Sequence, residues 1–170
     1  PPQYLTYEAD TRSDDEIKEN FHDQARLLDP FIDFFYFDVL SSVREFQLGI
    51  KAIESFNKPY LIGAHISEGV KLPSGERISK IISEIKHKNL LGIILSCISP
   101  ENFAENLDEV KNLSIPFGFK LNAFLTTKPT DGYTKTFNES KTGNPNEFLG
   151  LRKDLTPEKM SKFAKKFKDA

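Results

Sequence analysis

The stretch Leu91-Gly-Ile-Ile-Leu-Ser-Cys-Ile-Ser-Pro-Glu101 decides the fold of this chain. The run 91–96 is short and apolar, and Ser99-Pro100 is a typical helix start. Together they predict a buried strand that leads directly into a helix. Cys97, the only cysteine of the chain, lies between the two, at the predicted carboxyl end of the strand.

Three further apolar runs, at 31–37, 60–66 and 117–121, have the same character. Such continuous apolar runs are typical of parallel strands that are buried on both faces. The strand centres recur about every 25 to 32 residues, which is the period of a repeated βα unit. The sequence therefore predicts an α/β fold with parallel strands, either an open doubly wound sheet or a closed (βα)8 barrel.

The predicted helices begin at polar caps that precede apolar stripes. Capping boxes, with Glu three residues after Ser, are expected at two of these starts. The expected helix starts are Ser13, Ser42, Ser74 or Gly75, Ser99 and Thr156.

Composition limits the classes of function. The 170 residues are expected to form a single domain, 1–170, and the net charge of -2 gives no basic surface for nucleic acid. One cysteine allows no intrachain disulfide and fits a reducing compartment, so we expect a cytoplasmic protein. No apolar stretch is long enough to cross a membrane. Neither nucleic acid nor a membrane is therefore expected as a partner.

Polar residues stand at the predicted strand ends, where ligands bind in parallel α/β folds. Asp38 follows four aromatic residues and is either a desolvated functional carboxylate or a helix cap. Cys97 is either a thiolate ligand or nucleophile, or a small buried residue. His65 is either a metal ligand or a hydrogen-bonded core residue. Asn122 either orients a substrate or ties down the loop that follows it.

That loop, 123–154, is rich in Thr, Lys, Asn, Gly and Pro and shows no periodicity. Loops of this length in compact domains are often functional. Because it follows the end of a strand, its central part, 126–146, is predicted to act as a lid over the site.

In chain order, these segments resemble the homocysteine S-methyltransferase family. Phe37-Asp-Val-Leu-Ser-Ser-Val-Arg-Glu45 resembles the family's Phe-Glu-Thr-Ile-Pro segment after the fourth barrel strand. Leu72-Pro-Ser-Gly-Glu76 is similar to its Leu-Ser-Asp-Gly-Thr loop. Leu95-Ser-Cys97 corresponds to Val-Asn-Cys, and Lys120-Leu-Asn-Ala123 to Tyr-Pro-Asn-Ala/Ser. Tyr4-Leu-Thr-Tyr-Glu-Ala-Asp10 resembles the segment after the third strand.

The resemblance implies part of a (βα)8 barrel, with this chain covering roughly strands four to seven. It implies methyl transfer from a small-molecule donor to the thiol of homocysteine, which yields methionine, through a zinc-bound thiolate. Cys97 would be the first of three cysteine ligands to zinc, and a Gly-Gly-Cys-Cys pair would follow Ala170. Asp38 would contact the substrate's amino group, where the family has Glu, and Asn122 would be a pocket residue.

A different class of function remains as the alternative. Ser96 stands where the family has Asn, and Phe124 where it has Gly. The alternative is a non-catalytic barrel domain that binds a small molecule or another subunit. Cys97 would then be a packing residue, and Asp38 would cap a helix.

Overall fold

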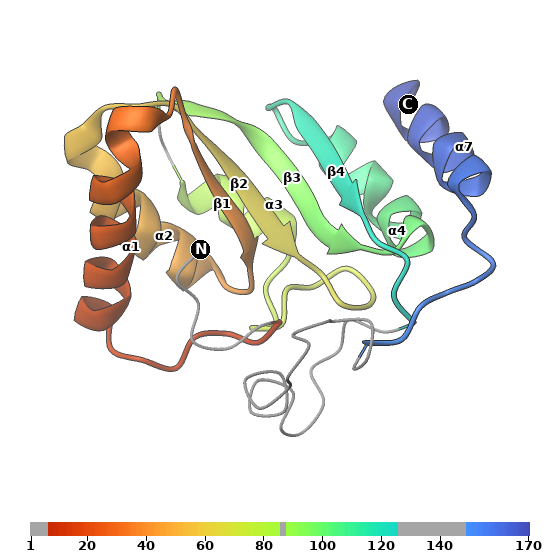
Figure 1. Ribbon diagram of the computed structural model, residues 1–170, viewed down its shortest axis with the longest axis horizontal. Helices are drawn as coiled ribbons and strands as arrows, with labels where there is room; N and C mark the ends of the chain where they lie inside the picture. The colour runs from red at the N-terminus through yellow and green to blue at the C-terminus, as the bar shows by residue number, and fades with distance from the viewer. Residues whose placement is uncertain (1–6, 86–87, 126–148) are drawn as a thin grey trace.

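The computed structural model describes residues 7–85, 88–125 and 149–170. They contain one parallel sheet whose four strands lie side by side in chain order (Figure 1). The strands are β1 (Phe35–Leu40), β2 (Tyr60–His65), β3 (Leu90–Ile98) and β4 (Phe117–Leu121). The helices are α1 (Asp14–Leu28), α2 (Val43–Ile53), α3 (Ile78–Glu84), α4 (Pro100–Lys111) and α7 (Pro157–Lys168).

The connections confirm the predicted βα repeats. Helix α2 joins β1 to β2, α3 joins β2 to β3, and α4 joins β3 to β4. Strand order does not reverse among the four described strands, whereas a doubly wound sheet reverses at its ligand-binding crevice. The architecture is therefore α/β with a parallel sheet and is consistent with part of a barrel-like fold. No helix in the described ranges is both long and apolar enough to cross a membrane.

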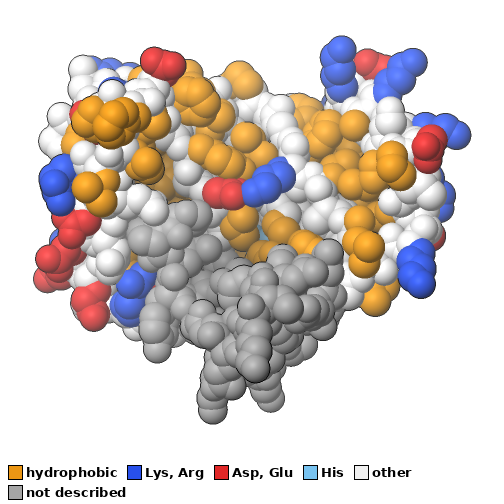
Figure 2. Space-filling model, viewed as in Figure 1, with side chains coloured by type: hydrophobic (Ala, Val, Ile, Leu, Met, Phe, Trp, Pro, Cys, Tyr) orange, Lys and Arg blue, Asp and Glu red, His pale blue; other side chains and the backbone are white. Residues whose placement is uncertain are grey.

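The two faces of the sheet differ because side chains alternate along each strand. One face packs against α2, α3 and α4, which lie behind the sheet in Figure 1. Its buried residues include Phe35, Phe37, Ile62, Ala64, Ile93 and Leu95, joined to Phe46, Ile50, Ile78, Ile81 and Phe103 of the helices. Figure 2 views the opposite face, which is largely hydrophobic and uncharged, with an acidic and a basic side chain next to each other near its middle.

The first strand starts later than predicted, so the prediction 31–37 is wrong at both ends. Residues Asp29–Phe31 form a 3-10 helix, and Phe31 is 85% exposed. The Lys58 ammonium holds the preceding loop by donating to the carbonyl of Ile32 at 2.9 Å. Because β1 then runs on to Leu40, Asp38 lies inside the strand and not after it.

Helix α3 also starts later than predicted. The segment with Ser74 and Gly75 forms a turn, and the Ser74 hydroxyl donates to the carbonyl of Ser41 at 2.9 Å instead of capping a helix. Arg77 is the N-cap residue, but its side chain makes no capping hydrogen bond. Glu109 of α4 replaces the cap, since its carboxylate accepts from the backbone N–H of Ser79 at 3.1 Å.

The other predicted helix starts are confirmed. Ser13, Ser42, Ser99 and Thr156 each accept a hydrogen bond from a backbone N–H in the first turn. At α2 the cap is Ser42, which accepts from the N–H of Glu45 at 3.1 Å. The alternative role of Asp38 as a helix cap is therefore wrong.

Glu45 itself is buried in the first turn of α2, where its carboxylate accepts from the Ser42 hydroxyl at 2.6 Å. Burial raises the pKa of this carboxyl group above its ordinary value of 4.5, and hydrogen bonds to the carboxylate partly oppose the effect. The folded protein therefore binds the Glu45 proton more tightly than the unfolded chain does.

We predict that Glu45→Gln removes one component of the pH dependence of stability. Glu45 contributes most to stability below about pH 4.5, and this contribution is lost as the pH rises through its raised pKa. Gln does not ionise, so the free energy of unfolding should fall less between pH 4.5 and pH 7.5 in the variant. Urea unfolding of both proteins at the two pH values measures the difference, and equal falls would contradict the prediction.

Candidate functional site

Two β-bulges lie towards the carboxyl end of the sheet. The register of β1 with β2 shifts around Val39, and the register of β3 with β4 shifts around Cys97. Both residues have left-handed backbone conformations, with φ of 59° and 55°, which a branched side chain such as Val rarely adopts. A bulge redirects side chains and is frequent next to active sites. Cys97 is the second-last residue of β3 and therefore lies at the carboxyl end of this strand, as predicted.

Two polar groups contact the sulfur of Cys97. The Tyr7 hydroxyl lies 3.0 Å from Sγ, and the side-chain amide of Asn122 donates to Sγ at 3.5 Å. Burial raises the pKa of the Cys97 thiol, while the hydrogen bonds from Tyr7 and Asn122 lower it because they stabilise the thiolate. The net effect is a raised pKa, so these surroundings keep the thiol neutral near pH 7.

Tyr7 connects the sulfur to His65. The two rings are 4.5 Å apart between centroids, and both residues are buried. His65 Nδ1 lies 3.2 Å from the carbonyl oxygen of Ser96, and Nε2 lies 2.8 Å from the Ser67 hydroxyl. Because both ring nitrogens are engaged, the geometry agrees with the core alternative for His65. Sequence reasoning missed Tyr7, although it lies in a segment that resembles the family.

Asp38 lies on the face of the sheet that the helices do not cover. Its Oδ2 accepts from the Lys120 ammonium of β4 at 2.5 Å. Its Oδ1 is buried and accepts no hydrogen bond from the described residues. The nearby Tyr36 hydroxyl is hydrogen-bonded to Ser96. Burial raises the pKa of Tyr36, and the negative charge of Asp38 adds to this effect.

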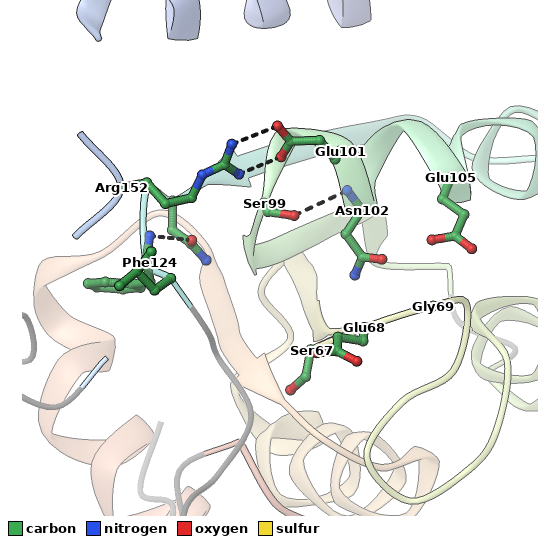
Figure 3. Close-up of a pocket in the computed structure, with 11 residues that line it drawn as sticks. Ser67, Glu68, Gly69, Ser99, Glu101, Asn102, Glu105, Phe124 and Arg152 are labelled. Carbon is green, nitrogen blue, oxygen red and sulfur yellow. Dashed lines mark hydrogen bonds and ion pairs between the residues drawn. The ribbon is translucent and has the colours of Figure 1, made fainter. Parts of the chain in front are cut away.

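A pocket of about 460 Å³ opens beside Asn122 (Figure 3). Its walls come from the loops after β2 and β4 and from the first turns of α4. On one side Arg152 forms a two-pronged ion pair with Glu101, at 2.7 and 2.9 Å. Asn122 accepts from the N–H of Phe124 at 3.0 Å while its amide reaches Cys97, so this side chain links the pocket to the sulfur.

The fold thus brings the predicted site residues towards one region, although not all of them are in contact. Cys97 and Asn122 are in contact. The charges of Lys120 and Asp38 act in opposite directions on the pKa of the Cys97 thiol, so this ion pair lies within electrostatic reach of the sulfur. The predicted lid, 126–146, lies outside the described residues.

Zinc fits this site only in part. Cys97 offers one thiolate, the type of ligand that zinc prefers, but zinc normally takes four ligands. Within the described ranges, no group of three or more His, Cys, Asp or Glu side chains could hold a metal ion. These residues therefore do not form a complete zinc site.

Comparison with protein-family models identifies the family of this chain. The family model for homocysteine S-methyltransferase matches residues 2–170, which include the whole described sheet and both bulges. No curated protein matches the chain.

We predict that Tyr7→Phe slows alkylation of Cys97. Loss of the hydroxyl removes a hydrogen bond that stabilises the thiolate, so the pKa of the thiol should rise further. At pH 8, with a chelator present, the rate with iodoacetamide should fall by roughly threefold to tenfold. Peptide mass spectrometry measures modification at Cys97, and Tyr60→Phe, at the other end of the sheet, is the control. An unchanged or faster rate in Tyr7→Phe would show that this hydrogen bond does not stabilise the thiolate.

Proposed function

This chain belongs to the homocysteine S-methyltransferase family, and from that premise we propose that the protein methylates the thiol of homocysteine or a related small thiol. The family supports a transferase that moves a methyl group to a thiol in general. The observation that carries the finer proposal is the position of the Cys97 sulfur, held by Tyr7 and Asn122 beside an open pocket. We further propose that residues 1–170 form one domain that covers roughly strands four to seven of a (βα)8 barrel.

Cys97 is proposed as one ligand of a zinc site whose other ligands the described residues do not supply. Zinc, when bound, lowers the pKa of a coordinated thiol so that the reactive thiolate is present at neutral pH. The protein surroundings alone have the opposite effect on Cys97, because burial raises the pKa of its thiol. Deprotonation of sulfur at this place therefore calls for an added positive charge, which fits the proposed ligand role.

Asp38 and Asn122 are proposed to bind the substrate. The buried Oδ1 of Asp38 is an acceptor without a hydrogen bond among the described residues, so a substrate ammonium group would satisfy it. A charge-assisted hydrogen bond of this kind contributes about 1.5–3 kcal/mol. Asn122 would orient groups at the boundary between the pocket and the sulfur, since its amide already contacts both sides.

The test is methyl transfer by the intact protein, with Cys97→Ser as the variant. We expect the parent to convert homocysteine to methionine with at least one of the methyl donors supplied, as measured by mass spectrometry. Replacement of a zinc ligand should lower both zinc content and turnover by roughly tenfold or more. Ser83→Ala, an exposed change on α3, should leave both at the parent level.

Two outcomes would count against the proposal. Parent-level zinc in Cys97→Ser, measured by elemental mass spectrometry, would mean that Cys97 is not a ligand. No transfer to any thiol from any donor by the parent would favour the alternative of a non-catalytic domain that binds a small molecule or another subunit.

A further inference from the structure

Lys120 places a positive charge on the uncovered face of the sheet, two residues before Asn122. Its ammonium reaches from β4 to Asp38 on β1, so the ion pair spans β2 and β3. Between them, β2 has Gly63, where an added Cβ would lie 2.8 Å from the hydroxyl oxygen of Ser96. An added Cβ there would also lie 2.9 Å from a ring carbon of Tyr36, so the Tyr36 side chain packs over Gly63 on the face where Lys120 and Asp38 meet.

The two residues of the ion pair differ in solvent exposure. The Lys120 side chain is 52% exposed, whereas that of Asp38 is 26% exposed. An ion pair with one half-exposed partner contributes little to stability, so it exchanges readily. Asp38 in contrast keeps a second, buried oxygen that accepts nothing from the described residues. Lys120 is therefore free to turn to another anion if a cation takes its place on Asp38.

The pair also adjoins the proposed position of the acceptor's sulfur. Lys120 is the register partner of Ser96, the residue directly before Cys97. Both charges of the pair are felt at the Cys97 sulfur, in opposite directions. A small thiol held with its sulfur near Cys97 would therefore extend its other end towards the two charges.

We propose that Lys120 binds the α-carboxylate of an α-amino-acid thiol, next to the ammonium group that Asp38 is proposed above to bind. The ammonium group binds the Asp38 carboxylate, and the α-carboxylate binds the Lys120 ammonium. This inference rests on the proposed function and makes Lys120 a residue that determines the class of acceptor. A zwitterion exchanges with the existing ion pair and leaves no charge unpaired, whereas a thiol with only one of the two groups leaves one partner without its counter-charge.

The test compares binding of three thiols to the intact protein by calorimetry. Homocysteine carries both groups, 4-mercaptobutanoate lacks the ammonium, and 3-aminopropane-1-thiol lacks the carboxylate. Lys120→Met should weaken homocysteine and 4-mercaptobutanoate by roughly tenfold and leave 3-aminopropane-1-thiol unchanged or tighter. Asp38→Asn should weaken homocysteine and 3-aminopropane-1-thiol and spare 4-mercaptobutanoate.

Three controls keep the result specific. Lys120→Arg, which keeps the charge, should retain most of the affinity for homocysteine. Lys162→Met, an exposed lysine of α7, should bind all three thiols as the parent does. Should Lys120→Met unfold at a lower temperature than the parent, Lys120→Gln repeats the comparison with a polar end in place.

The outcomes separate this inference from the proposed function. Equal weakening of all three thiols in Lys120→Met, or no weakening of homocysteine, overturns the role of Lys120 even if the parent transfers methyl groups. Selective weakening of the two carboxylate-bearing thiols supports it. If that pattern is found in a protein that methylates no thiol, the recognition of the amino-acid group stands and the transfer reaction does not.

Discussion

Parallel pairing of four consecutive strands is the constraint on which the rest of the structure depends. Each strand must be entered from the same end, so α2, α3 and α4 return the chain along one face of the sheet. The carboxyl ends of all strands then lie at one edge. For this reason Asp38, Cys97 and Asn122, which are far apart in the chain, come within reach of one another without any local sequence signal that joins them.

The edge of the sheet contains two chemically different regions. Around Cys97 the groups are neutral donors, Tyr7 and Asn122, in buried surroundings that disfavour a bare negative charge. Around Asp38 the groups form an ion pair, in which the half-exposed Lys120 side chain contacts the Asp38 carboxylate. Membership of the homocysteine S-methyltransferase family suggests a chemical reason for the difference between the two regions. A soft sulfur and a charged amino-acid end have different requirements, and under the proposed function the two regions would meet them separately.

Much of the fold was accessible from the sequence because it depends on local patterns. Apolar runs and serine or threonine caps indicate the strands and most helices, and strand 117–121 was predicted with its observed bounds. The late start of α3 was not accessible, because its first turn is capped by Glu109, about 30 residues away. The bulge at Val39, the contact of Tyr7 with Cys97 and the reach of Lys120 to Asp38 likewise arise from long-range packing. The position of Asn122 after β4 was predictable, but its contact with the sulfur was not.

The left-handed backbone at Cys97 sets stability against chemistry at a single position. Glycine adopts this conformation without steric cost, whereas a residue with a Cβ atom destabilises the folded protein there by about 1–2 kcal/mol. At Val39 a substitution by glycine would give up packing contacts with Tyr7 and Leu149 in exchange for the relaxed backbone. At Cys97 the same substitution by glycine would remove the only sulfur atom in β3. Selection for thermal stability alone would therefore be expected to replace Cys97 by glycine. Retention of cysteine at this position in an evolving lineage would indicate selection for the thiol.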